Sequence, residues 1–189
     1  MKETKLKFGV IGSGSWATAL IKILSENNND INWYIRNTKN IEFIKENSHN
    51  PNYLSSVELN LKKLKISAEI NEVVEASNVI IIAVPSEYVN DEMKKIDLDI
   101  SKKIIICALK GLVPETNLLF GEHMQKHFGI SPNKFLVIGG PCHAEEVALE
   151  KLSYLTIGSS NLELCKIISE KFSCKYINVK ASDDVIGIE

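Results

Sequence analysis

Short apolar runs alternate with longer amphipathic segments along most of the chain. Six runs rich in β-branched and aromatic residues predict strands, at residues 7–12, 31–35, 78–85, 103–110, 134–140 and 153–158. Helical spacing of apolar positions is found between them, at residues 15–27, 38–47 and 161–172. Because strands that alternate with helices form parallel sheets covered on both faces, we predict an α/β, doubly wound, mostly parallel fold.

Two segments depart from this simple alternation. Residues 64–70 form only a weak strand pattern. The stretch before it, residues 47–65, is expected either to help cover a binding site or to be a plain loop. Near the end of the sequence, residues 172–182 predict a late strand followed by a turn. Residues 183–189 then begin a further apolar element, so we place the end of the first domain at residue 182.

Composition and charge exclude several classes of protein. The chain has 189 residues, of which 44% are hydrophobic and 24% are charged, with a formal net charge of -2. Its lysines are interleaved with acidic residues, so no nucleic-acid partner is expected. No segment has the ~18 apolar residues of a membrane helix, and the N-terminus does not match a secretion signal. The widely spaced cysteines predict neither a disulfide framework nor a metal site, and we expect a cytoplasmic protein.

The first strand-to-helix turn has glycines in a pattern typical of dinucleotide binding. Residues 12–17 read Gly-Ser-Gly-Ser-Trp-Ala, which is G-x-G-x-x-A. Gly12 permits the sharp turn, Gly14 lets the backbone approach a pyrophosphate, and Ala17 lets helix and strand pack closely. A tight turn without a ligand is the alternative. The position of the glycine motif at the start of a chain in which strands and helices alternate favours dinucleotide binding. Trp16 either packs in the core or forms a wall of the cofactor cleft.

The only arginine of the chain, Arg36, follows the second predicted strand. It comes about 20 residues after Gly14, where NAD-binding proteins commonly place an acidic residue that holds the ribose 2′-hydroxyl. A planar, always-charged guanidinium instead suits the 2′-phosphate of NADP. We therefore predict NADP(H) as the preferred cofactor, with NAD(H) possible and no metal. A solvated surface arginine is the alternative.

Three further strand ends have polar or turn residues. These are Pro85 and Ser86, then Lys110 and Gly111, and finally the stretch GGPCHAEEVA at residues 139–148. Ligands of open α/β sheets bind outside the carboxyl ends of the strands. We therefore expect these loops to meet beside the nicotinamide and to hold a substrate.

Taken together, these stretches resemble the NAD(P)-dependent glycerol-3-phosphate dehydrogenases of bacterial type. The matching stretches occur in the family's order: GVIGSGSWATAL, IIIAVPS, LKGL, GGPCHAEEVA and DVIGIE. The resemblance implies a Rossmann-type domain over residues 1–182 and the reversible reduction of dihydroxyacetone phosphate to sn-glycerol 3-phosphate for phospholipid synthesis. It also implies that residues 183–189 begin a helical substrate domain, otherwise absent here, which supplies a general acid/base lysine. A homodimer is possible in the full-length enzyme.

The resemblance also implies roles for individual residues. Cofactor contacts are implied for Gly12, Gly14, Ser15, Trp16, Ala17, Arg36, Pro85, Lys110 and Ala144. Substrate contacts are implied for Lys110, Gly140 and Cys142. Lys110 is the expected catalytic residue, because an ammonium group between nicotinamide and substrate can neutralise a phosphate or stabilise charge on a carbonyl oxygen.

Two residues depart from the family pattern. The family usually has Ser or Thr at the position of Cys142 and an aromatic residue at that of His143. A thiol is a weaker hydrogen-bond donor than a hydroxyl, which weakens the expected substrate contact. A Cys142 nucleophile activated by His143 is disfavoured, because neighbours at a helix start point apart whereas a nucleophile and its base must meet.

The remaining candidate residues are interpreted as structural. His123 and His127 lie one helical turn apart but lack the Glu and the third ligand of a zinc helix, so a surface helix is expected. Glu145 and Glu146 are expected to stabilise the start of a helix.

Two other functions stay open. One is another reductase on the same first domain, of the 6-phosphogluconate or ketopantoate type, which the loops at Lys110 and Gly140 disfavour. The other is a non-catalytic NADP(H)-binding sensor.

Overall fold

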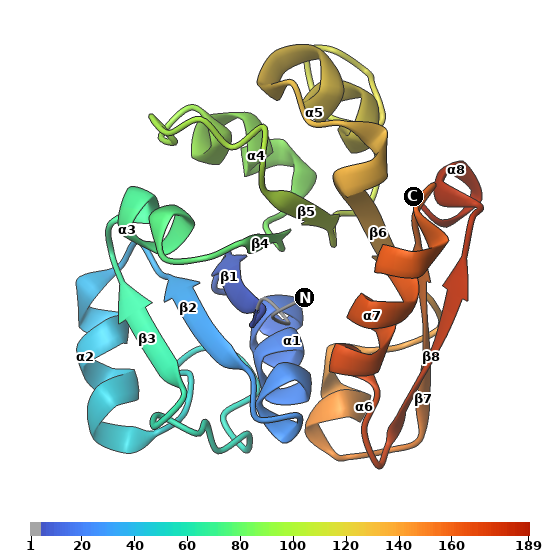
Figure 1. Ribbon diagram of the computed structural model, residues 1–189. Coiled ribbons are helices and arrows are strands. Elements are labelled where there is room, and N and C mark those ends of the chain that lie inside the picture. The colour runs from blue at the N-terminus through green and yellow to red at the C-terminus, as the bar shows by residue number, and fades with distance from the viewer. Residues whose placement is uncertain (1–4) are drawn as a thin grey trace.

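A single sheet of eight strands organises the chain in the computed structural model, which describes residues 5–189. The strands are β1 (Lys7–Ile11), β2 (Asp30–Tyr34), β3 (Leu64–Ser67), β4 (Val79–Ile82), β5 (Ile104–Cys107), β6 (Phe135–Gly139), β7 (Ser153–Gly158) and β8 (Ile177–Ser182). Their order across the sheet is β3-β2-β1-β4-β5-β6-β7-β8. All neighbouring strands are parallel except β6 and β7. The prediction of a doubly wound, mostly parallel α/β fold is confirmed (Figure 1).

Helices connect most of these strands. They are α1 (Ser15–Glu26), α2 (Thr38–Asn47), α3 (Ile70–Glu75), α4 (Ser86–Met93), α5 (Phe120–Phe128), α6 (Ala144–Ala148), α7 (Leu162–Phe172) and α8 (Val185–Ile188), with one 3-10 turn, η1 (Pro132–Lys134). The three helices predicted from periodicity correspond to α1, α2 and α7. Within residues 5–189, no helix is both long enough and apolar enough to cross a bilayer.

Two apolar cores lie on opposite faces of the sheet. Helices α1, α2, α6 and α7 pack over one face, and α3, α4, α5 and α8 over the other (Figure 1). Strand β4 contributes to both cores, because Val79 and Ile81 point to the first and Ile80 and Ile82 to the second. This alternation explains why the strand has no polar position.

Helix α5 lies at the surface, as expected, but only one of its two histidines is exposed. The side chain of His123 is buried and its ring stacks on Phe120, with 6.2 Å between ring centroids. Phe120, His123 and Met124 lie on one face of the helix and pack inward, while His127 is exposed. The spacing of the histidines was evident from the sequence, but the direction of the helix face depended on its packing against β6.

Candidate cofactor and substrate site

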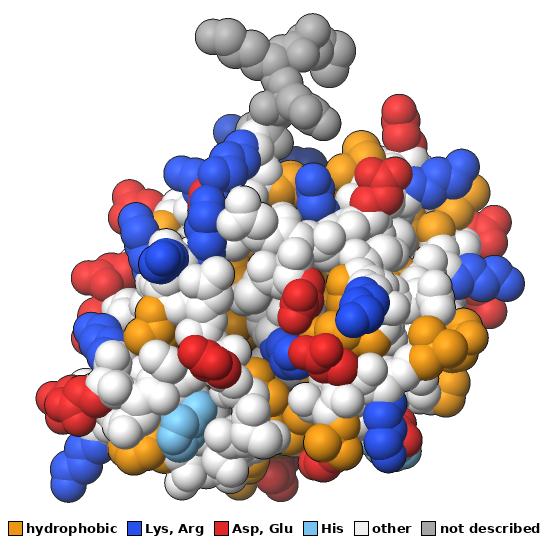
Figure 2. Space-filling view, turned by 90° about the horizontal axis from the view of Figure 1, so that it is seen from below, with side chains coloured by type: hydrophobic (Ala, Val, Ile, Leu, Met, Phe, Trp, Pro, Cys, Tyr) orange, Lys and Arg blue, Asp and Glu red, His pale blue; other side chains and the backbone are white. Residues whose placement is uncertain are grey.

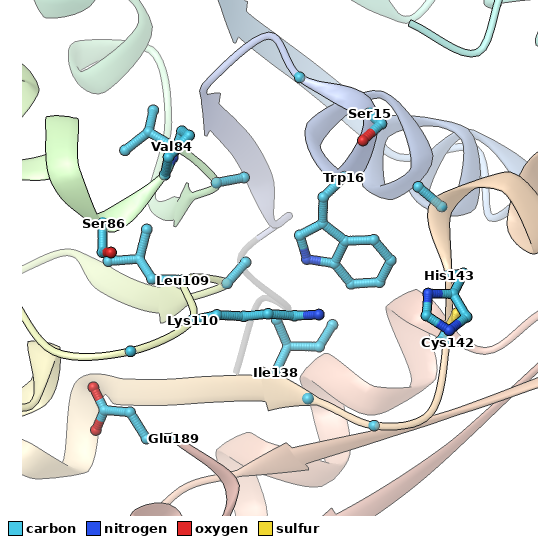
Figure 3. Close-up of a pocket in the computed structure, with 18 of the residues that line it drawn as sticks. Ser15, Trp16, Val84, Ser86, Leu109, Lys110, Ile138, Cys142, His143 and Glu189 are labelled. Carbon is cyan, nitrogen blue, oxygen red and sulfur yellow. The ribbon is translucent and has the colours of Figure 1, made fainter.

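A cleft of about 630 Å³ opens at the carboxyl ends of the four central strands (Figure 3). Its walls come from the connections that follow β1, β4, β5 and β6. The chain leaves β1 and β4 toward opposite edges of the sheet, so the cleft lies at the topological switch point, where open α/β sheets bind their ligands. Of the residues predicted for the site, the cleft brings together Gly14, Ser15, Trp16, Pro85, Lys110, Gly140, Cys142 and Ala144.

A second hollow, of about 170 Å³, adjoins this cleft at the glycine turn. The two share Gly14, Ala83, Val84 and Pro85 in their linings. Arg36 lines the second hollow, and Lys110 lines the first. The hollows therefore form one path that runs past the glycine turn, with Arg36 lining one part and Lys110 the other. Sequence reasoning missed four further residues of the second hollow, Tyr34, Tyr53, Tyr88 and Glu92.

The two glycines of the turn have different reasons to be glycine. Gly12 has a φ of +128°, and a β-carbon there would overlap the carbonyl oxygen of Ala83. Gly14 has an ordinary φ of -77°, and among residues 5–189, apart from Gly14 and its two chain neighbours, no heavy atom lies within 4 Å of the place where its β-carbon would be. The fold thus requires Gly12, whereas the open space beside Gly14 is what the close approach of a pyrophosphate needs.

The start of α1 is also suited to an anion. Its N-cap, Gly14, makes no side-chain cap hydrogen bond, and the first turn contains no acidic residue. The positive end of the helix dipole and the first backbone N–H groups are therefore not neutralised by the helix itself. Together with Gly14, they fit a phosphate group of a dinucleotide.

Trp16 both packs partly against the first core and lines the cleft. Figure 3 shows the indole facing the cleft, with Lys110 extending across the cleft below it. Ile138 adds an apolar surface from the end of β6. This end of the cleft offers an apolar wall and one ammonium group, which suits a flat ring and a phosphorylated or carbonyl-containing molecule.

The two predicted cations are free to bind ligands. Within residues 5–189, neither Arg36 nor Lys110 forms an ion pair or a side-chain hydrogen bond, and both side chains are exposed. In contrast, Lys22 is paired with Glu26 and Glu150.

Cys142 lies in the cleft wall as a half-buried thiol. Burial raises the pKa of the Cys142 thiol, and the negative charge of Glu146 raises it further, while the Ser153 hydroxyl lowers it. His143 lines the same cleft, but no hydrogen bond joins its ring to Cys142 in the described part of the chain. A raised thiol pKa is the opposite of what a cysteine nucleophile needs.

Glu189 is a cleft residue that sequence reasoning did not find. Its carboxylate accepts a hydrogen bond from the backbone N–H of Gly121 at 2.9 Å, and it lines the cleft beside Ile188. Burial raises the pKa of this carboxyl group. No local pattern could have predicted this placement, because the bond joins segments far apart in the sequence. Within residues 5–189, no group of three or more His, Cys, Asp or Glu side chains is arranged to hold a metal ion.

Comparison with known proteins shows the family to which the chain belongs. A family model described as the N-terminus of NAD-dependent glycerol-3-phosphate dehydrogenase matches residues 7–165. The chain belongs to this family. The resemblance seen in the glycine turn and the later loops is thereby confirmed.

Individual members of the glycerol-3-phosphate dehydrogenase family match nearly the whole chain. The glycerol-3-phosphate dehydrogenase [NAD(P)+] of Macrococcus caseolyticus is 32% identical over 188 residues, which cover 97% of this chain and 56% of the relative. That of Bacillus pumilus is 30% identical, covering 97% of this chain and 53% of the relative. The crystal structure of the Coxiella burnetii glycerol-3-phosphate dehydrogenase superposes with a TM-score of 0.84 at 26% identity, covering 97% of this chain and 55% of that one. The chain therefore spans about half the length of the relatives it matches.

Proposed function

We propose that this chain is the cofactor-binding part of an NAD(P)-dependent glycerol-3-phosphate dehydrogenase. The reaction is hydride transfer between the cofactor and dihydroxyacetone phosphate or sn-glycerol 3-phosphate, which would supply phospholipid synthesis. One observation carries the proposal: a single path joins Arg36, the open side of Gly14 and Lys110. Membership of the family favours this reaction over those of the 6-phosphogluconate and ketopantoate reductases.

NADP(H) is the preferred cofactor in this proposal, and NAD(H) is the second choice. The guanidinium of Arg36 has no partner among the described residues and lines the hollow next to the glycine turn. It can therefore bind a ribose 2′-phosphate with two parallel hydrogen bonds. The uncapped start of α1 would hold the pyrophosphate, with contacts from Ser15, Trp16 and Pro85.

The bound nicotinamide would supply the hydride or accept it. Lys110 would act on the substrate side, where its ammonium group stabilises negative charge on the carbonyl oxygen or on the substrate phosphate. Gly140 and Cys142 would border the substrate, and Ala144 the cofactor. The indole of Trp16 would keep water from one side of the reacting groups, which strengthens the electrostatic effect of Lys110.

The domain arrangement is part of the same proposal. Residues 1–182 would form the dinucleotide-binding domain, and residues 183–189 the beginning of a helical substrate domain. The general acid/base lysine implied by the family would lie beyond Glu189.

Titration of this chain with NADPH and then NADH tests the proposal, followed by tryptophan fluorescence or by heat. We expect binding of both, with NADPH bound at least tenfold more tightly. Binding of neither cofactor would contradict the proposal. The substrate is tested by NADPH oxidation with dihydroxyacetone phosphate, 6-phosphogluconate and ketopantoate, using the protein encoded when the reading frame is followed past Glu189. A stop codon directly after Glu189, together with NADPH binding, would favour the sensor instead.

A further inference from the structure

Buried side chains from distant segments hold the carbonyl groups of the glycine turn. The indole Nε1 of Trp33, on β2, donates to the carbonyl oxygen of Gly12 at 2.6 Å. The side-chain amide of Asn50, in the loop after α2, donates to the carbonyl oxygen of Ser13 at 3.1 Å. Trp33 is fully buried and Asn50 is 2% exposed. These bonds therefore form in the interior, where an unsatisfied partner is costly.

A third buried side chain, that of Thr18, holds the next carbonyl group of the turn. The hydroxyl of Thr18, on α1, donates to the carbonyl oxygen of Gly14 at 2.9 Å and accepts a hydrogen bond from the Asn50 amide at 2.9 Å. Thr18 is also fully buried. Three successive carbonyl groups are thus held by three side chains, of which two are hydrogen-bonded to each other.

Holding the carbonyl groups also orients the N–H groups of the turn. A peptide unit is planar, so the N–H of each residue points opposite to the carbonyl of the residue before it. The N–H groups of Ser13, Gly14 and Ser15 must therefore point away from the buried side chains. Within the described residues, none of these three groups donates a hydrogen bond. They are donors that are fixed in direction and have no partner.

We propose that Trp33 and Asn50 are positioning residues for the cofactor's pyrophosphate. This inference rests on the proposed function. It adds to that function the side chains that align the N–H groups of the glycine turn. Neither side chain lines the cleft or the adjoining hollow. They act through the peptide units of Gly12 and Ser13, so that these units need no reorientation when an anion binds. Donors oriented in advance bind more tightly because the cost of ordering them is met during folding.

Asn50 also connects the turn to the hollow that contains Arg36. Its side-chain oxygen accepts hydrogen bonds from the backbone N–H groups of Asn52 at 3.0 Å and Tyr53 at 3.3 Å. Tyr53 lines that hollow together with Arg36. A single buried amide thus uses its nitrogen to hold the glycine turn and its oxygen to hold the loop that contributes Tyr53 to the adjoining hollow.

Asn50→Asp separates these two uses of the amide. Aspartate keeps an oxygen that can accept from the loop, but it cannot donate to Ser13 or Thr18. Asn47→Asp is the matched control, because Asn47 is an exposed residue whose amide donates only within its own helix, to Phe43. Trp33→Phe removes the other donor without adding charge and is the second variant.

The experiment measures binding of NADPH and of adenosine 2′-phosphate, which has no pyrophosphate. We expect Asn50→Asp and Trp33→Phe each to weaken NADPH binding about tenfold or more. Adenosine 2′-phosphate should change less than threefold, and Asn47→Asp should affect neither ligand. NADPH binding that stays equal to wild type in both variants, or that falls equally in Asn47→Asp, would overturn the inference.

A measurement on the unaltered chain keeps the inference testable if a variant does not fold. Inorganic pyrophosphate is added, and the amide signals of Ser13, Gly14 and Ser15 are followed by NMR. These three signals should shift together, and more than the amide of Gly129, which lies outside the site. If the dinucleotide binds but pyrophosphate leaves the three signals unchanged, this inference alone fails. If the chain binds neither NADPH nor NADH, the proposed function fails.

Discussion

The α-carbon of Gly12 lies so close to the carbonyl oxygen of Ala83 that a β-carbon on Gly12 would overlap it. Ala83 directly follows β4, and its N–H donates to the carbonyl of Ile11 at 2.8 Å. The two strand ends that flank the switch point are therefore in direct contact. Two residues further along the turn, the side of Gly14 is open.

This contrast predicts opposite effects for two identical substitutions. Gly12→Ala combines a positive φ with a backbone clash and should destabilise the fold by about 2 kcal/mol or more. Gly14→Ala meets no protein atom and should change the free energy of unfolding by about 1 kcal/mol or less. It should nevertheless weaken NADPH binding at least tenfold, since its methyl group would occupy the ligand's space. Urea unfolding and NADPH titration of both variants provide the check, and normal cofactor binding by Gly14→Ala would contradict the site.

Arg36 should determine the choice between the two cofactors. Arg36→Gln should weaken NADPH binding about 10- to 100-fold, because charge-assisted hydrogen bonds to the 2′-phosphate are lost. NADH has no such phosphate and should change less than threefold. Lys45→Gln, which removes an exposed cation from the last turn of α2, is the control and should leave both affinities unchanged. Equal weakening of NADPH and NADH would show that Arg36 does not contact the 2′-phosphate.

Cys142 should behave as an unreactive thiol despite lining the cleft. Burial raises its pKa, so the thiolate fraction at pH 7 is smaller than that of an ordinary cysteine. We expect slow alkylation of Cys142 by iodoacetamide at pH 7, a rate that rises steeply above pH 9, and protection by bound NADPH. Peptide mass spectrometry distinguishes it from the other cysteines, with Cys142→Ser as the reference. Rapid alkylation at pH 7 would instead support activation by His143.

His123 should make the fold sensitive to mild acid. Burial lowers the pKa of its ring, and the charge of His127 lowers it further. Protons therefore bind the unfolded chain before the folded one, so the stabilising contribution is present above the unfolded pKa of about 6.5 and is lost as the pH falls below it. His123→Phe should reduce the loss of stability between pH 7.5 and pH 5.5, whereas His127→Gln should have a smaller effect. Urea unfolding at both pH values measures this difference.

Most of the fold could be predicted because the strands are continuous apolar runs. The run containing Ile80 and Ile81 is typical of a strand buried on both faces, and the structure places it between two cores. The burial of His123 could not be predicted, because a helical pattern shows which residues share a face but not where that face is directed. The reversed direction of β7 likewise depends on how the chain crosses from β6, and no local pattern reports it.

Some residues of the candidate site could be predicted from the sequence, and others could not. Gly14, Arg36 and Lys110 could be placed at one edge of the sheet, because residues that follow parallel strands meet there. Trp33 and Asn50 could not be found, since their role consists of hydrogen bonds to a turn that is distant in sequence. Sequence spacing identifies residues that follow strands. It does not identify the buried side chains that form hydrogen bonds to those residues.

The central position of β1 also affects how the protein is made. Phe8, on β1, pairs with Val79 of β4, which is synthesised only after β2 and β3. Until β4 arrives, one edge of β1 has no partner, and the glycine turn lacks its neighbour Ala83. The binding path is therefore incomplete in a growing chain, because Ala83, Val84 and Pro85 belong to both of its parts. A dinucleotide bound as proposed would stabilise only chains in which β4 has already docked, so it would not assist earlier steps of folding.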